Sequence, residues 1–307
     1  MTTIKIKRAL ILAAVGLPLH ANAAEQECVR DLTAVPVQFQ SAIQYEDMQT
    51  KANPAVRVLI NGKPARMVLD TGSNRHSLWD ASLLDEKPGS AVEHQLAIAG
   101  MGEVRRVQAT VADHHGHALR QDFDFMTDSA LAKDGYAGIL SPQLLAGKNV
   151  TILDFEANCF FTSPSFDSSN ANGLDVHRGV AIQNAWYIVG ISAELDQSII
   201  PLLVDSGAAR TTIQAALVAA KPMGGNSPKT MDIFKAELPD GGQMRLVDLK
   251  INGLTFESLP VIPRHTDGGK VMVNLGAVGM DVLKGRIVYY DGAQHQFHLM
   301  WHPLRHF

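Results

Sequence analysis

Two short stretches contain the residues best suited to chemistry. Residues 68–73, VLDTGS, return in altered form at 203–208 as LVDSGA, with two apolar residues, an aspartate, a hydroxyl residue and a glycine in the same order. Two carboxylates at hydrogen-bonding distance cannot both ionise cheaply, so they share one proton, and one acts as a base while the other acts as an acid. We therefore predict that Asp70 and Asp205 form one site between two related halves. The competing interpretation is a pair of unrelated strand-to-turn corners.

A second pair of stretches supports the repeat. Residues 138–145, GILSPQLL, and 276–283, GAVGMDVL, both predict an apolar strand, a small residue and a short helix, and an apolar strand ending in aspartate follows each. Ser141 stands 71 positions after the first aspartate, and Gly279 stands 74 positions after the second. The repeat thus keeps its spacing as well as its order, which favours two related halves over chance similarity.

Short strands are expected to position these residues. Apolar runs at 56–60 and 65–69 flank Asn61-Gly62, a dipeptide that favours a tight hairpin because both residues tolerate a positive φ. The second strand of this hairpin ends at Asp70. Strands of about five residues bounded by Gly, Asp and Asn are frequent elsewhere, and helical patterns are weak. The sequence therefore predicts an all-β fold with a few short helices, at 129–132, 143–145 and 212–220.

The N-terminus has the pattern of an export signal. Three basic residues within the first eight precede an apolar run at 9–17, and residues 21–23, ANA, are the small residues that a signal peptidase recognises. We predict a signal peptide at 1–23 and a periplasmic or secreted protein. The apolar run is too short to cross a bilayer, so we expect no stable membrane insertion.

Both cysteines, Cys28 and Cys159, lie beyond that signal. An exported chain meets oxidising surroundings, where an even cysteine count suggests pairing, so we predict a disulfide between them. The alternative is two buried thiols that never meet.

Composition divides the remaining chain near its middle. Residues 163–173 are rich in Ser, Asn and Gly and predict a linker. The predicted organisation is an N-terminal arm at 24–53, a first β lobe at 54–162 carrying Asp70, and a second β lobe at 174–307 carrying Asp205. The formal net charge of −4 over 307 residues gives no reason to expect a nucleic acid partner.

Together these motifs resemble those of the pepsin and retropepsin superfamily of aspartic peptidases, most closely bacterial exported members with two retropepsin-like lobes in one chain. The resemblance extends over residues 56–299. It implies a bilobal acid protease fold with the active-site cleft between two related β lobes. It also implies a monomeric aspartic endopeptidase, without cofactor or metal, in which the Asp70/Asp205 pair activates a water against a peptide or protein substrate.

Neighbouring residues are expected to support the two aspartates. Gly72 and Gly207 let the backbone turn sharply and let the two loops approach each other. The resemblance further implies that Thr71 and Ser206 each hydrogen-bond into the opposite loop and so fix the carboxylates in plane.

One difference between the two loops suggests separate roles for the carboxylates. Ser73 can donate a hydrogen bond to Asp70, whereas Ala208 cannot do so for Asp205. We therefore expect Asp70 to hold the negative charge and Asp205 to hold the shared proton.

A substrate cover is also expected. Residues 96–107 look like a retropepsin flap, with an apolar strand, a glycine-rich tip and a returning strand. The tip is predicted to lie against an extended peptide and to swing aside, through Ile98, Gly100, Met101 and Gly102. A plain surface hairpin is the alternative.

Two departures from the family pattern define a rival function. Ser141 stands where the family prefers glycine, and residues 96–107 contain no tyrosine, which pepsins carry in the flap. The rival is a catalytically weak or inactive peptide-binding module of the cell envelope with the same fold.

Other polar clusters predict no further chemistry. Residues 113–117, DHHGH, are the densest group of potential metal ligands, but neighbouring side chains in a strand alternate faces, so we expect an exposed hairpin turn. Asp154 and Asp291 are expected to cap the turns that follow their strands. The C-terminal histidines are expected at the surface, at His295, His298, His302 and His306.

Overall fold

The structure is a computed structural model that describes residues 35–85, 104–126, 132, 134–167, 171, 173–183, 188–226, 243–265 and 274–303. The first half contains β1 (Phe39–Gln44), β2 (Ala55–Ile60), β3 (Lys63–Leu69), β4 (His76–Leu78), the short 3₁₀ helix η1 (Ala81–Leu83), β5 (Val104–Ala112), β6 (Ala118–Met126), β7 (Gly138–Leu140), α1 (Pro142–Ala146), β8 (Val150–Asp154) and β9 (Cys159–Ser163). The second half contains β10 (Asp175–Gln183), β11 (Val189–Leu195), β12 (Ser198–Val204), β13 (Thr212–Gln214), α2 (Ala215–Val218), β14 (Met223–Asn226), β15 (Gln243–Ile251), β16 (Leu254–Arg264), β17 (Gly276–Val278), α3 (Met280–Leu283), β18 (Ile287–Asp291) and β19 (Gln296–Trp301).

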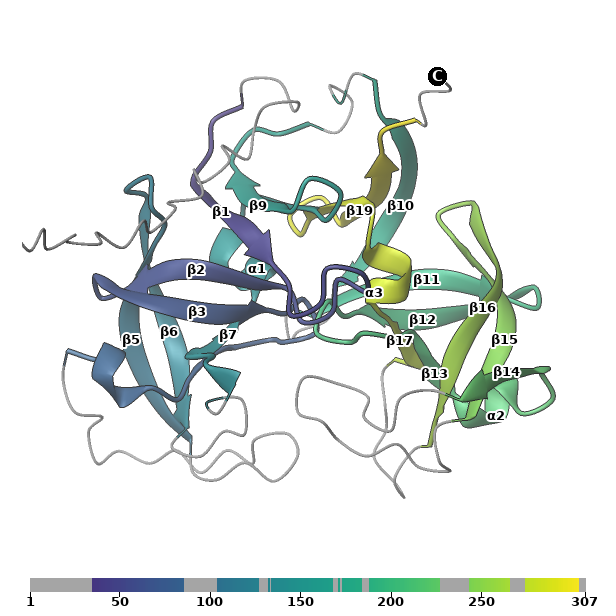
Figure 1. The fold of residues 1–307 in the computed structure, drawn as a ribbon. Helices are drawn as coiled ribbons and strands as arrows, with labels where there is room; N and C mark the ends of the chain where they lie inside the picture. Colours follow the sequence, from purple (N-terminus) through teal and green to yellow (C-terminus); the bar gives the residue numbers. More distant parts are fainter. Residues whose placement is uncertain are drawn as a thin grey trace, which may run out of the picture.

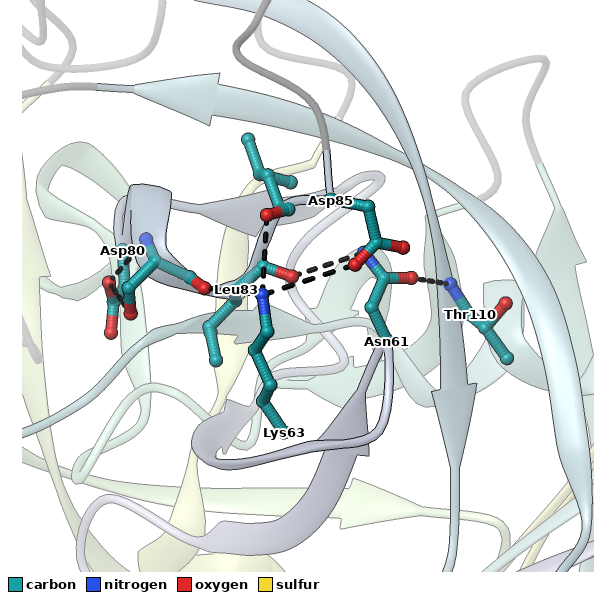
Figure 2. A network of polar contacts seen from close by, with 8 residues as sticks. Asn61, Lys63, Asp80, Leu83, Asp85 and Thr110 are labelled. Carbon is teal, nitrogen blue, oxygen red and sulfur yellow. Dashed lines mark hydrogen bonds and ion pairs between the residues drawn. The ribbon is translucent and has the colours of Figure 1, made fainter.

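The hairpin predicted around Asn61-Gly62 is confirmed. These two residues have φ values of 49° and 77°, and β2 pairs antiparallel with β3 from the turn onwards, Ile60 opposite Lys63. The Asn61 side chain fastens the turn to its neighbours, donating to the carbonyl of Leu83 at 3.1 Å and accepting the N–H of Thr110 at 2.8 Å (Figure 2). The strand that leads to Asp70 is therefore anchored at its far end.

Strand pairing repeats between the two halves. In the first half β7 lies between β3, to which it is parallel, and β4, to which it is antiparallel, and β4 is also parallel to β6. In the second half β17 lies between β12 and β13 in the same senses, and β13 is parallel to β16. Figure 1 shows the two strand groups on opposite sides of the molecule. The predicted repeat of sequence is thus a repeat of structure.

A third sheet joins the halves. Its antiparallel pairs give the strand order β1, β9, β8, β18, β19, β10, and β8 and β18 meet at its centre, with Leu153 opposite Val288. Every residue of these two central strands is buried. Buried strands favour β-branched and aromatic residues, which make up most of both sequences. Each half contributes three strands to this sheet, and side chains of both halves, such as Ile152 and Tyr289, pack in one hydrophobic cluster.

Both of the aspartates that end these central strands cap turns, as predicted. The Asp154 carboxylate accepts the N–H of Ala157 at 2.7 Å, and the Asp291 carboxylate accepts the N–H of Ala293 at 2.9 Å. Both side chains are buried, and both are far along the chain from the two aspartates of the repeated loops.

Two expectations about local structure are corrected. The helix predicted at 212–220 is mostly absent, because Thr212–Gln214 forms β13, held between β16 and β17, and only Ala215–Val218 is helical. His298 is buried rather than exposed, because β19 lies inside the third sheet. The His298 imidazole stacks on Tyr289 at 4.8 Å between ring centroids. The helix predicted at 143–145 is found as α1.

Several predictions fall on residues that the structure does not describe. The signal peptide, most of the 129–132 helix and parts of the 163–173 linker lie outside the described residues. Among the residues that are described, no helix is long and apolar enough to cross a membrane.

Candidate active site

The two repeated loops leave equivalent strands of the two halves. Asp70 follows β3, and its N–H donates to the carbonyl of Leu140 at the end of β7, at 3.1 Å. Asp205 follows β12, and its N–H donates to the carbonyl of Val278 at the end of β17, at 3.0 Å. Each carboxylate is thus placed by a parallel strand pair, which holds the backbone of its loop from behind.

The glycines of the two loops lie against the opposite aspartates. A Cβ atom added to Gly72 would stand 2.7 Å from the carboxyl carbon of Asp205. One added to Gly207 would stand 3.0 Å from the carboxyl carbon of Asp70. The structure therefore brings the two aspartates together by a reciprocal approach that only glycine permits without displacement.

Thr71 and Ser206 bind the loops to each other crosswise. The Thr71 hydroxyl donates to the carbonyl of Val204 at 2.8 Å and accepts the N–H of Ser206 at 2.9 Å. The Ser206 hydroxyl donates to the carbonyl of Leu69 at 2.7 Å and accepts the N–H of Thr71 at 3.0 Å. Each hydroxyl is therefore satisfied both as donor and as acceptor, and all four bonds are buried, so the arrangement strongly resists sliding of one loop past the other.

Burial and mutual repulsion favour one proton on the carboxylate pair. Burial raises the pKa of Asp70, while the N–H of Gly72, at 2.7 Å from its Oδ1, and a hydrogen bond from Asp205 oppose the rise. Burial raises the pKa of Asp205 well above its usual range, and the charge of Asp70 raises it further. The electrostatics therefore place the proton on Asp205 and the negative charge on Asp70.

The sequence-based reason for this assignment was wrong in one detail. The Ser73 hydroxyl donates to the carbonyl of Arg75 at 2.7 Å rather than to Asp70. A serine hydroxyl readily bonds a backbone group two residues away, and that local partner wins here. Asp70 instead receives the backbone N–H of Gly72, and that of Ser73 also lowers its pKa.

Four residues behind the loops were not identified from the sequence. The Gln143 amide donates to the carbonyls of Thr71 and Ser73, each at 3.0 Å, and so holds the first loop directly. The other three form one hydrogen-bonded corner in each half. In the first half His76 accepts the N–H of Ser141; in the second Thr211 accepts the N–H of Gly279 and donates to Asp281. Their only signal in the sequence is position within the repeat. His76 and Thr211 each stand six residues after their aspartate.

The remaining predicted site residues are only partly described. The flap tip, Ile98 and 100–102, and Cys28 lie outside the described residues. Cys159 is buried at the start of β9, and its pairing with Cys28 stays a prediction.

The histidine-rich segment 113–117 forms the turn between β5 and β6, as expected. Its aspartate is buried, contrary to the expectation of an exposed turn, because the Asp113 carboxylate accepts the N–H groups of Gln40, His115 and His117, each at 2.9 Å. Asp113 therefore fastens the turn to β1. No group of three potential metal ligands occurs in the described part of the chain.

No family model and no curated protein sequence matches this chain. Among solved structures it is similar to the aspartic proteinase from Irpex lacteus, with a TM-score of 0.55 and 15% identity over 87% of this chain and 98% of that one. It is also similar to basic 7S globulin from soybean, with a TM-score of 0.49 and 12% identity over 86% of this chain and 95% of that one. The likeness to the Irpex lacteus protein shows that this chain has the bilobal all-β fold of the pepsin-like proteinases.

Proposed function

We propose that this protein is an aspartic-type endopeptidase whose catalytic residues are Asp70 and Asp205. The observation that carries the proposal is the reciprocal packing of each carboxylate on the glycine of the opposite loop. The crosswise bonds of Thr71 and Ser206 support it, since they hold the two carboxylates in one fixed arrangement. The export signal in the sequence supports a periplasmic or secreted protein acting on peptides or proteins.

The proposed reaction uses the unequal protonation of the pair, which is the established behaviour of pepsin-type dyads. Asp70 takes a proton from a water molecule, whose oxygen attacks the carbonyl carbon of the peptide bond, while Asp205 gives its proton to the carbonyl oxygen. The tetrahedral intermediate then loses its amine, which leaves with the proton that Asp70 accepted, and a hydroxyl proton returns to Asp205. The bond broken is C–N, and one water is consumed.

Paired variants test the proposal. We expect the wild-type protein to cut a random peptide library at acidic pH and a statine-type transition-state analogue to inhibit it. Asp70→Asn and Asp205→Asn should each lower kcat by about 10⁴-fold or more, because the two residues act as a unit. Asp175→Asn, which changes an exposed aspartate of β10, should cut as the wild type does.

The rival function gives a different result in the same experiment. A non-catalytic peptide-binding module would bind the statine analogue without cutting the library at any pH. The absence of a tyrosine from residues 96–107 is the sequence observation that keeps this rival open. Undiminished cutting by either aspartate variant would contradict the proposed mechanism itself.

A further inference from the structure

One peptide group connects Asp70 to a buried histidine. The carbonyl of the Leu140–Ser141 peptide accepts the N–H of Asp70 at 3.1 Å. The N–H of the same peptide donates to Nδ1 of His76 at 3.1 Å. Because a peptide group is planar and rigid, a change at His76 is transmitted to the backbone of Asp70.

The second half contains the same connection with a different residue. The carbonyl of the Val278–Gly279 peptide accepts the N–H of Asp205 at 3.0 Å, and its N–H donates to the Thr211 hydroxyl at 3.2 Å. That hydroxyl donates in turn to Asp281 at 2.7 Å, so its oxygen is fixed as an acceptor. His76 and Thr211 therefore do the same task, but only the imidazole can titrate near neutral or acidic pH.

The task of His76 requires a neutral ring. Its Nδ1 accepts the Ser141 N–H only through a lone pair, and in the imidazolium both nitrogens carry protons. The side chain is 2% exposed and lies beside Phe123, with 5.2 Å between ring centroids. Little room and little water are available there for a protonated ring to find another arrangement.

We propose that His76 is a positioning residue that holds the peptide behind Asp70 through Ser141, and that loss of this hydrogen bond on protonation lowers kcat at low pH, in addition to the loss caused by protonation of Asp70 itself. The inference rests on the proposed function. It assigns pH-dependent positioning to a residue of the first lobe, His76, where the second lobe has Thr211.

The surroundings of His76 determine where the loss occurs. Burial lowers the pKa of His76 to about 4, while Gln121 and the Asp122 carboxylate on β6 favour the protonated form. The cation of the adjacent Arg75 is paired with Asp124 at 3.1 Å. The neighbouring β7 and α1 contain no charged residue. As pH falls through about 4, His76 gains a proton, the Ser141 N–H loses its acceptor and kcat falls.

Kinetics over pH 2.5–7 separate positioning from mere support, using a range chosen to bracket an ordinary histidine pKa and that of a buried one. His76→Asn keeps an acceptor at the δ position that does not titrate, and should retain kcat at pH 5. Its acid limb should become shallower, because only protonation of Asp70, the catalytic base, then remains to lower kcat. His76→Leu keeps the volume without the acceptor, and should lose about 10- to 100-fold in kcat with little change in KM. An unchanged acid limb in His76→Asn, or wild-type kcat in a folded His76→Leu, would overturn the proposal.

His298 offers a matched control. It is also buried, its pKa is also lowered chiefly by burial, and its Nδ1 also accepts a backbone N–H, from Gly179 at 3.3 Å. It lies on β19, which pairs with β10 and β18 rather than with a strand that ends at either aspartate loop. His298→Asn should therefore leave the acid limb of kcat in place, and its removal by this variant would count against a specific role for His76.

A measurement without substrate tests the same inference if the protein proves not to cut peptides. In amide NMR spectra, the Ser141 and Asp70 signals should share a step with a midpoint near pH 4, the titration expected of His76, besides any step that the Asp70 signal takes from its own carboxyl. In His76→Asn the Ser141 signal should stay in place over that step, and the Asp70 signal should keep only the change caused by its own carboxyl. Absence of a shared step in the wild type, or an unchanged shared step in the variant, would refute the positioning role whatever the outcome for catalysis.

Discussion

The corners behind the two aspartates share one hydrogen bond, to the N–H of Ser141 or Gly279, but make it with different residues. His76, Ser141 and Gln143 in the first half stand where the second half has Thr211, Gly279 and Asp281. In the second half Asp281 accepts a hydrogen bond from the Thr211 hydroxyl, which in turn accepts the N–H of Gly279. In the first half the His76 imidazole accepts the N–H of Ser141, and the Gln143 amide donates to the aspartate loop instead. The residues at these three positions are therefore exchanged together, because the group that accepts the backbone N–H determines what its neighbour binds.

Backbone conformation explains why one corner tolerates a side chain. Ser141 precedes Pro142, which restricts it to extended conformations, and it has φ −84° and ψ 111°. Gly279 has φ −99° and ψ −172°, and a Cβ there would lie 2.6 Å from the carbonyl carbon of Arg210. The first corner is therefore compatible with serine, which removes the structural objection that this departure raised, while the second corner requires glycine.

Exchanging these two residues gives the largest expected effect. Gly279→Ser forces a side chain onto the backbone of Arg210, which cannot move aside as a side chain can, and should destabilise the protein by about 3 kcal/mol or more. Ser141→Gly should cost only about 1 kcal/mol, from the added freedom of the unfolded chain. Urea unfolding measures both. Equal costs would show that the two corners do not differ as described.

Variants that remove the crosswise hydrogen bonds test whether the two loops contribute equally to stability. Thr71→Ala leaves the carbonyl of Val204 and the N–H of Ser206 buried without that partner, and should cost about 2–3 kcal/mol. Ser206→Ala should cost a similar amount, since its hydroxyl also makes two bonds. Thr71→Ser and Ser206→Thr keep the hydroxyls and serve as controls in the same unfolding series. A clear difference between the two alanine variants would mean that one loop carries more of the connection.

The two aspartates should differ in how they link stability to pH. Both pKa values are raised by burial, that of Asp205 more strongly because Asp70 also repels its charge. A carboxyl whose folded pKa is raised stabilises the native state at low pH, and this contribution is lost as pH rises above the unfolded value near 3.8.

Replacing either aspartate by asparagine, which does not ionise, removes this loss of stability. Asp205→Asn should therefore raise Tm at pH 7 and leave it nearly unchanged at pH 3, and Asp70→Asn should raise it less. For a domain of this size about 1 kcal/mol corresponds to roughly 2–4 °C. Thermal unfolding at the two pH values measures the effect, and a larger gain from Asp70→Asn would reverse the proton assignment.

The approach of the two aspartates could be predicted because their signal is local and repeated. Each loop carries its own strand, hydroxyl residue and glycine, so comparison within one chain was sufficient. The corners could not be predicted in this way, since His76 and Thr211 share no chemical type and only the fold reveals their common task. The Ser73 hydroxyl was assigned to the wrong partner because sequence spacing does not distinguish a carboxylate from a nearer carbonyl. His298 was expected outside because its burial depends in part on β10, which is distant in the sequence.

Two equivalent hairpin turns also differ in whether the sequence contains the residues that such a turn favours. The turn before Asp70 has Asn61-Gly62, whereas the equivalent turn between β11 and β12 has Asp196-Gln197, with φ values of 50° and 66°. Both turns need two residues at positive φ, but only the first has the glycine that adopts it without strain.

Gln197→Gly should therefore stabilise the protein by about 0.5 kcal/mol, because relief of a left-handed conformation outweighs the added freedom of glycine in the unfolded chain. Gly62→Gln is the reciprocal change. A Cβ there meets no atom within 4 Å, so its cost measures backbone strain alone and should be similar in size and opposite in sign. If Gln197→Gly instead destabilises the second lobe, the exposed side chain of Gln197 contributes something to this turn that backbone conformation does not account for.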